Sequence, residues 1–156
     1  MMDAGSPMGQ FPQLEMQFDG GSRGNPGLAG IGVTITTPDG VMVYEFGDWL
    51  PHATNNVAEY TALIRGVQAA RQLGATRLNI RADSELVVRQ ITGRYRVKSP
   101  DLKPLYAQAV AELARVADWS ISHVYRESNS RADQLANMAM DRRKKIESIG
   151  TTSVER

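Results

Sequence analysis

A strand-like alternation of apolar and polar residues begins at Leu14. The stretch LEMQF alternates the two kinds, as a half-buried strand does, and it stops at the turn-rich segment DGGSRGNPG. Two more runs rich in β-forming residues follow, GIGVTITT and VMVYEFG, and Pro38-Asp39-Gly40 between them is a strong turn signal. We predict that these three strands form an antiparallel meander.

The pattern changes to helical spacing at Asn55. Apolar residues then recur every three or four positions up to Leu73, and Gly74 suits a C-terminal cap. LNIRAD has the pattern of a buried strand, and a short helix is predicted after it over residues 84–91. This order of strand, helix and strand predicts a crossover within a single α/β sheet.

Helical spacing and strand-like alternation both occur again in the last third of the chain. After a polar, proline-punctuated segment, helical spacing covers residues 105–117, WSISHVY alternates as a strand, and ADQLANMAMDRRKK forms a final helix. The last residues, IESIGTTSVER, lack a packing periodicity. We therefore expect one domain over residues 14–141, with flexible tails at 1–13 and 142–156.

Length and composition agree with one compact domain. A chain of 156 residues, 42% of them hydrophobic, is long enough for one core and too short for two ordinary ones. The absence of cysteine excludes disulfides and cysteine-based zinc or thiol chemistry, and the cytoplasm is the default location. The first residues do not resemble a signal peptide, and no apolar stretch approaches the ~20 residues that span a bilayer, so no membrane partner is expected.

Four acidic residues carry the candidate chemistry. Asp19 follows an apolar strand, Glu59 lies in a helix, Asp83 ends another strand and Asp133 opens the last helix. Carboxylates crowded near one point repel one another unless cations neutralise them, and oxygen ligands suit Mg²⁺ or Mn²⁺. The pattern therefore indicates a divalent-metal site. Taken singly, three of these acids also have ordinary explanations as helix-cap, first-turn or strand-end residues.

The glycine-rich segment between residues 20 and 27 does not form a phosphate cradle of the P-loop kind. It lacks the GK[ST] of a P-loop and the G-x-G-x-x-G of a dinucleotide fold, and it leads into a strand instead of a helix. A nucleotide-cofactor function is therefore disfavoured. Glycine still permits close backbone approach to a polymer, because it has no Cβ.

The four acidic segments together give the chain a family resemblance. DGGSRGNPG, TNNVAEY, ADSELVV and N-x-x-AD-x-LA occur in this order, and from about Leu14 to Met140 the chain resembles type 1 ribonuclease H. Without a basic protrusion or a separate N-terminal hybrid-binding domain, it is most similar to the compact bacterial and archaeal members. The resemblance implies an α/β, ribonuclease H-like fold, in which helices cover both faces of a five-stranded mixed sheet of three antiparallel and two parallel strands.

The resemblance also implies an activity. Asp19, Glu59, Asp83 and Asp133 would be catalytic carboxylates that hold two Mg²⁺ or Mn²⁺ ions with the substrate. The protein is then expected to be a metal-dependent endoribonuclease that cuts the RNA strand of RNA/DNA hybrids to 5′-phosphate and 3′-hydroxyl products, with RNA/RNA duplexes open as a second substrate. We expect a monomer, because no long apolar surface stripe stands out.

Two other functions compete with this one. A related nuclease that acts on DNA is disfavoured by the paired asparagines Asn55 and Asn56, because DNA has no 2′-hydroxyl to read. A hybrid-binding module without catalysis is disfavoured by the four acids, which such a module would not concentrate beside a phosphate backbone.

Polar residues beside the acids are the candidates for substrate contact. By the resemblance, Asn25, Asn55 and Asn56 contact the RNA strand and Thr54 contacts a DNA phosphate, whereas turn formation and helix capping are the alternative roles for the asparagines. The predicted substrate-binding set is completed by Gly20, Gly21, Ser84, Glu85 and Arg126.

The chain departs from many relatives at two of these places. Glu85 stands where glutamine is common, which adds a negative charge near the expected RNA path. The loop VYRESNSR lacks the family's histidine, and its Arg126 stays charged, so we assign Arg126 to phosphate or product binding and not to base catalysis. His123, on the preceding strand, is interpreted as structural.

Charge restricts nucleic-acid contact to local patches. The formal net charge is only +1, which excludes a strongly basic, non-specific nucleic-acid coat. The basic run at 142–145 is expected to complement the dipole at the end of the last helix. Four other basic residues suit either the path of a DNA strand or a solvated loop, namely Arg94, Arg96, Lys98 and Lys103.

Overall fold

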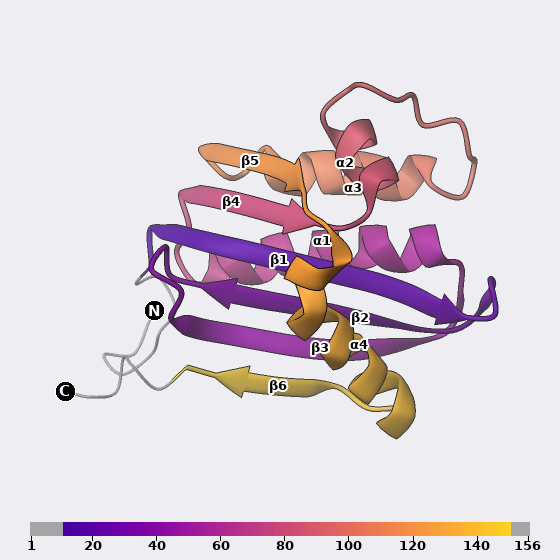
Figure 1. The fold of residues 1–156 in the computed structure, drawn as a ribbon. Coiled ribbons are helices and arrows are strands. Elements are labelled where there is room, and N and C mark those ends of the chain that lie inside the picture. The colour runs from indigo at the N-terminus through magenta and orange to yellow at the C-terminus, as the bar shows by residue number, and fades with distance from the viewer. Residues whose placement is uncertain (1–10, 151–156) are drawn as a thin grey trace.

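A twisted mixed sheet organises the molecule. The structure is a computed structural model and describes residues 11–150 (Figure 1). The sheet has six strands in the order β5-β4-β1-β2-β3-β6. Their bounds are Gln13–Arg23 for β1, Gly27–Thr36 for β2, Met42–Ala53 for β3, Arg77–Ala82 for β4, Asp118–His123 for β5 and Ile146–Ile149 for β6.

Strand directions follow from the connections. Short turns join β1, β2 and β3, so these strands pair antiparallel, while helical crossovers make β4 parallel to β1 and β5 parallel to β4. The predicted set of three antiparallel and two parallel strands is therefore confirmed. The sixth strand, β6, pairs antiparallel with the outer edge of β3.

Helices cover both faces of this sheet. The helices are α1 (Asn55–Gln72), α2 (Glu85–Ile91), α3 (Lys103–Leu113) and α4 (Ser130–Arg142), with a short 3₁₀ turn at Arg126–Asn129. In Figure 1, α4 lies in front of the strands and α1 lies behind them, and α3 packs against α1. No helix in the described part of the chain is both long and apolar enough to cross a membrane.

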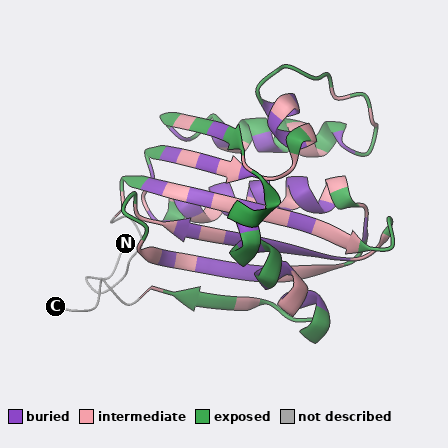
Figure 2. Ribbon diagram, in the orientation of Figure 1, coloured by how far each residue is buried: buried purple, intermediate pink, exposed green. Residues whose placement is uncertain are grey.

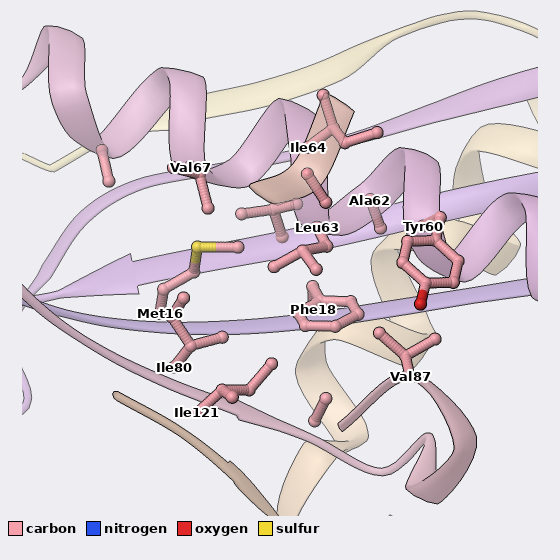
Figure 3. Close-up of a cluster of buried hydrophobic side chains, with 14 of the residues drawn as sticks. Met16, Phe18, Tyr60, Ala62, Leu63, Ile64, Val67, Ile80, Val87 and Ile121 are labelled. Carbon is pink, nitrogen blue, oxygen red and sulfur yellow. The ribbon is translucent and has the colours of Figure 1, made fainter. Parts of the chain in front are cut away.

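The main core lies between α1 and the sheet. Alternation on β1 buries Met16 and Phe18 completely, and both face Leu63 and Val67 of α1 together with Ile80 of β4 (Figure 3). Figure 2 shows the buried residues concentrated on β1–β4 and α1, whereas exposed residues occupy much of β5, β6, α4 and the outer loops. This rigid layer fixes the carboxyl ends of β1 and β4.

The C-terminal segment corrects the prediction for residues 142–156. Residues 146–149 were expected to be loose, yet they form β6, in register from Tyr44 opposite Ile149 to Gly47 opposite Ile146. Tyr44 donates its hydroxyl hydrogen to Glu147 Oε1 at 2.5 Å. Edge pairing, and not burial, holds this strand, because all its residues are exposed or partly exposed. Residues 1–10 and 151–156, also expected to be flexible, lie outside the described residues.

Several predicted boundaries also shift. The first strand continues past Phe18 through the glycine-rich segment to Arg23, because β2 pairs with it along that length. The final helix ends at Arg142, and not at Lys145, because Arg143 adopts the left-handed conformation (φ 50°) that closes the helix.

Candidate active site

Three carboxylates meet at the carboxyl ends of the parallel strands. Asp19 lies on β1, Glu59 on α1, and Asp83 directly after β4. One oxygen from each of them lies within 4.8 Å of the others. The parallel pairing of β1 with β4 ends at Phe18 opposite Ala82, so the next residues, Asp19 and Asp83, lie side by side.

A glycine on β1 admits the helix that carries Glu59. A Cβ built on Gly20 would lie 2.4 Å from the backbone carbon of Ala58 and 2.5 Å from the nitrogen of Glu59. Any side chain there would push α1 away, so only glycine lets Glu59 approach Asp19. The sequence predicted close backbone approach of this segment to a polymer; at Gly20 the structure shows close approach to α1 instead.

Asp133 joins the same pocket from the opposite side of the sheet. It lies in the first turn of α4 and lines the pocket with Asp19, Glu59 and Asp83. The pocket, called here the acidic pocket, is also lined by Gly20, Gly21, Ser22, Arg23, Asn55, Arg126, Ala136, Asn137 and Met140. All four acids singled out from the sequence therefore converge on it.

Burial and mutual repulsion raise the pKa values of two of these carboxyl groups, those of Glu59 and Asp19. Glu59 is only 8% exposed, and burial raises its pKa well above the usual value, with further contributions from the charges of Asp19 and Asp83. The pKa of Asp19 is raised to about 8, first by burial, then by the charge of Asp83 and by a hydrogen bond and charge from Asp133. Arg126 acts in the opposite sense and lowers the pKa of Glu59.

The pocket's chemistry suits a hard cation. Glu59 Oε1 is buried and finds no hydrogen-bond partner among residues 11–150, although a buried carboxylate oxygen normally has one. Clustered carboxylates with raised pKa values and a free oxygen are what a divalent cation with oxygen ligands would neutralise. The acidic cluster is consistent with a divalent-metal site.

Two of the predicted asparagines connect the start of α1 to β1 and to the turn after it through hydrogen bonds. Asn25 Oδ1 accepts a hydrogen bond of 3.0 Å from the backbone N–H of Asn55, and Asn55 Oδ1 accepts one of 2.8 Å from the N–H of Ser22. Thr54 caps α1, because its Oγ1 accepts from the N–H of Val57 at 3.2 Å. The helix-capping role considered for the asparagines therefore falls to Thr54, while Asn25 and Asn55 each accept a hydrogen bond from the backbone of another element.

A second depression lies beside the acidic pocket's loops. It is lined by Asn25, Thr54 and Asn56 together with residues of the proline-punctuated segment, namely Ser99, Asp101 and Leu102. The sequence did not single out Ser99 or Asp101, because nothing local shows that this segment folds back beside Thr54.

Two predicted residues, Ser84 and Glu85, line neither the acidic pocket nor the second depression. Ser84 caps α2 through a hydrogen bond from the N–H of Val87 at 3.3 Å. Glu85 forms an ion pair with Arg89 one turn further along α2, at 2.6 Å. Neither residue lines the pocket, so the negative charge of Glu85 is partly balanced on its own helix.

Several pocket residues were not predicted. Arg23 forms an ion pair with Asp141 at 2.8 Å and donates a hydrogen bond to Asn137 Oδ1 at 3.2 Å, which joins β1 to α4. Asn137 lies four residues after Asp133, so helical spacing from that acid places it on the same face. That spacing would have revealed Asn137, whereas Ser22 and Arg23 required knowledge that β1 runs through the glycine-rich segment.

Comparison with known proteins agrees with the fold and the pocket. The family model described as reverse transcriptase-like matches residues 17–139. Ribonuclease HI of Halobacterium salinarum is 48% identical over 129 residues, which cover 83% of this chain and 65% of that protein. The bifunctional protein Rv2228c of Mycobacterium tuberculosis is 47% identical over 130 residues, which cover 83% of this chain and 36% of that protein.

Solved structures give the same result. LC11-RNase H1, solved in complex with an RNA/DNA hybrid, superposes with a TM-score of 0.80 at 42% identity, covering 84% of this chain and 99% of that one. A mixed sheet with helices on both faces, and with an acidic pocket where the parallel pairing of β1 and β4 ends, defines a ribonuclease H-like protein. The chain belongs to the type 1 ribonuclease H family, in its compact form.

Proposed function

We propose that the protein is a metal-dependent endoribonuclease that hydrolyses the RNA strand of RNA/DNA hybrids and leaves 5′-phosphate and 3′-hydroxyl ends. One observation carries the proposal: carboxylate oxygens of Asp19, Glu59 and Asp83 lie within 4.8 Å of one another. These two curated relatives are longer, since the matched segment spans 65% of the halobacterial protein and 36% of the mycobacterial one. The catalytic unit is proposed to be residues 14–141.

The four acids of the pocket are proposed to hold two Mg²⁺ or Mn²⁺ ions when substrate is present. The fit rests on their oxygen donors and on the partnerless oxygen of Glu59. Ions so placed would activate a water on one side of a phosphodiester and stabilise the leaving oxygen on the other. Because their pKa values are raised, Asp19 and Glu59 hold protons in the metal-free protein and would release them when the ions bind. Arg126 lines the pocket and would attract a phosphate.

Substrate selection is proposed to rest on the polar groups beside the pocket. Gly20 and the partly exposed Gly21 line the pocket, and the second depression offers Asn25, Thr54 and Asn56 to a nucleic-acid backbone. Short amide and hydroxyl groups of this kind suit contacts to 2′-hydroxyls and phosphates in a shallow groove. LC11-RNase H1, a structural neighbour, was crystallised with an RNA/DNA hybrid, which supports this class of substrate.

The decisive experiment uses 5′-labelled RNA annealed to DNA. Cleavage is compared in Mg²⁺, in Mn²⁺ and in EDTA, for the wild type, for Asp19→Asn and for Asp118→Asn. Asp118 is a matched control because it is an exposed aspartate on β5 that pairs with Arg77 and does not line the acidic pocket. We expect cleavage by the wild type and Asp118→Asn, and loss of cleavage with Asp19→Asn or EDTA.

Three parallel substrates define the specificity. Single-stranded RNA and DNA/DNA are expected to stay intact, and cutting of RNA/RNA would add a second substrate. Extension of the upstream fragment by a polymerase tests for the expected 3′-hydroxyl. If the wild type cuts no RNA-containing duplex with either metal, the proposed function is wrong and a DNA nuclease or a hybrid-binding module takes its place.

A further inference from the structure

Asp133 differs from the other three acids in how it is held. Asp19, Glu59 and Asp83 form the close cluster, whereas Asp133 is an exposed residue in the first turn of α4. A helix turns by about 100° for each residue, so a small rotation of α4 redirects the Asp133 side chain. The position of Asp133 therefore depends on how the start of α4 is fixed to the sheet.

The start of α4 is fixed to β1 by an unusual N-cap. Asn129, at the N-cap, is 2% exposed and makes no side-chain capping hydrogen bond. Its Nδ2 donates instead to the backbone oxygen of Phe18, at 2.8 Å, one residue before Asp19. The side chain that would ordinarily stabilise the helix end thus links it to the strand that carries the first carboxylate.

The first turn is fixed to β3 by a two-pronged ion pair. Arg131 Nε donates to Glu45 Oε1 at 3.0 Å, and Arg131 Nη2 donates to Glu45 Oε2 at 2.6 Å. Glu45 is 7% exposed, so its charge is largely removed from water and depends on Arg131. Because the planar guanidinium of Arg131 makes two hydrogen bonds to the Glu45 carboxylate, the ion pair fixes the orientation of the Arg131 side chain as well as its distance from β3.

Between these two strands, β2 supports the same turn through a glycine. A Cβ on Gly32 would lie 1.9 Å from the backbone oxygen of Ala132, so the helix backbone rests directly on the sheet there. Residues 129, 131 and 132 thus contact β1, β3 and β2 in turn, and Asp133 follows immediately. Asn129 and Gly32 determine how close the helix lies, and the ion pair to β3 limits its rotation.

We infer that Glu45 and Arg131 are positioning residues that hold Asp133 over the acidic pocket. Neither lines the pocket, so they act on Asp133 through the first turn of α4 and not on substrate. The inference deepens the proposed function and rests on it, because it assigns Asp133 to the metal site. Groups that orient metal-binding side chains typically contribute 10–100-fold in metal affinity or activity.

The test compares two ion pairs. Arg131→Met and Glu45→Gln break the pair in question, and Arg71→Met breaks a matched pair between Arg71 of α1 and Glu112 of α3, at 3.3 Å. We expect Arg131→Met to lower kcat about 10–100-fold with KM within about twofold, and to weaken Mn²⁺ binding to the substrate-free protein by a similar factor. Arg71→Met should change neither quantity.

Two further variants separate positioning from general destabilisation. Arg131→Lys retains the charge and loses the fork, so it should recover part of the lost kcat and Mn²⁺ affinity. In an Asp133→Asn background, Arg131→Met should cause little additional loss, because the residue it positions has already been altered. An equal loss in both backgrounds, or an equal loss from Arg71→Met, would overturn the inference.

Failure of the proposed function is recognised separately. It is judged on the wild type alone, by whether any RNA-containing duplex is cut. If none is cut, calorimetric Mn²⁺ titrations decide the inference. It is supported if Arg131→Met weakens Mn²⁺ binding and if this weakening disappears in the Asp133→Asn background. It is overturned if the wild type and Arg131→Met bind Mn²⁺ with equal affinity. Urea unfolding of each variant confirms that the titrated protein is folded, and Glu45→Gln replaces Arg131→Met if the latter is not.

Discussion

At the scale of single residues, the features of Glu59 that suit the proposed function also lower the stability of the metal-free protein. Its carboxyl group is buried, repelled by Asp19 and Asp83, and has an oxygen without a hydrogen-bond partner in the described chain. Burying an ionised or unpartnered polar group costs on the order of 1–3 kcal/mol or more. Such a group is expected at a position where a ligand supplies the missing partner, and the cation proposed for the acidic pocket would do so.

We therefore predict that Glu59→Gln stabilises the metal-free protein and removes its activity. The free energy of unfolding in EDTA at about pH 8 should rise by on the order of 1–3 kcal/mol, because glutamine neither buries a charge nor has to take up a proton on folding. Hybrid cleavage should fall by about a hundredfold or more, since loss of the proposed metal ligand would raise the activation barrier by several kcal/mol. Urea unfolding and the labelled-hybrid assay measure the two effects.

A matched control is Glu112→Gln, whose carboxylate pairs with Arg71 and not with a cation site. That substitution should leave cleavage unchanged and should not stabilise the protein. A Glu59→Gln protein that is less stable than the wild type in EDTA would show that Glu59 has a stabilising partner.

The raised pKa of Asp19 predicts a pH dependence of stability. Between its ordinary value of 3.8 and its folded value of about 8, folded Asp19 keeps a proton that the unfolded chain has released. The free energy of unfolding of the metal-free protein should therefore fall as pH rises through this window, by up to about 1.4 kcal/mol per pH unit, and level off above it. Urea unfolding in EDTA from about pH 5 to about pH 9 measures the slope.

Asp19→Asn supplies the comparison for this slope, because it cannot titrate. Its stability should decline less steeply than that of the wild type over the same window, and added Mn²⁺ should flatten the wild-type slope by favouring the ionised form. Identical slopes for the two metal-free proteins would contradict the prediction.

The convergence of the acids was predictable from the sequence, but their hydrogen-bond partners were not. Asp19 and Asp83 each end an apolar, strand-like run, and parallel strands bring such ends together. By contrast, the Asn129 side chain donates to the backbone oxygen of Phe18 and does not cap its own helix. That contact depends on the distance between the start of α4 and β1, which only the folded chain defines. Local patterns give the residue type needed at a site, whereas tertiary distances decide which partner it takes.

At the scale of elements, predictability followed burial. Strands β1 and β4 and helix α1 bury one face, so their periods are visible in the sequence and were predicted correctly. Strand β6 buries no face, and its formation depends on backbone pairing with β3, which leaves no pattern in the side chains. The same reasoning explains why the glycine-rich end of β1 was taken for a turn.

We predict that β6 contributes stability and not catalysis. A chain ended after Lys145 loses the pairing with β3 and the Tyr44–Glu147 hydrogen bond, and should lose about 1–3 kcal/mol of unfolding free energy. Its kcat on hybrids should match the wild type, because β3 and β2 separate β6 from the strand that carries Asp19. A chain ended after Gly150 is the reference, and a kcat lowered only in the shorter chain would contradict the prediction.

At the scale of the whole molecule, charge is unevenly distributed although its sum is small. The formal net charge is +1, and acids are concentrated at the pocket that is proposed to receive a polyanion. Arg94, Arg96 and Lys98 are exposed in the segment that continues to Ser99, and Ser99 lines the second depression with Thr54. This placement favours the DNA-path interpretation of the basic segment over that of a solvated loop.

If these side chains contact phosphates, the binding of hybrid should respond to salt through them. Each phosphate contact contributes about 0.9 to the slope of log K against log salt concentration, so Arg94→Gln with Arg96→Gln should reduce its magnitude by up to about 2. Affinity at low salt should fall, and kcat at saturating hybrid should stay unchanged, because neither residue lines the acidic pocket. Fluorescence anisotropy with a labelled hybrid in Ca²⁺ measures the slope.

The paired control for this measurement is Arg142→Gln with Lys144→Gln, which removes the same charge from exposed positions at the end of α4. If net charge alone governed attraction, both double variants would weaken binding equally, since each changes the formal total from +1 to −1. Local contact predicts that only the Arg94 and Arg96 pair changes the slope, and an unchanged slope in that pair would assign the segment to solvent. The comparison therefore separates recognition by a particular surface from attraction by the molecule as a whole.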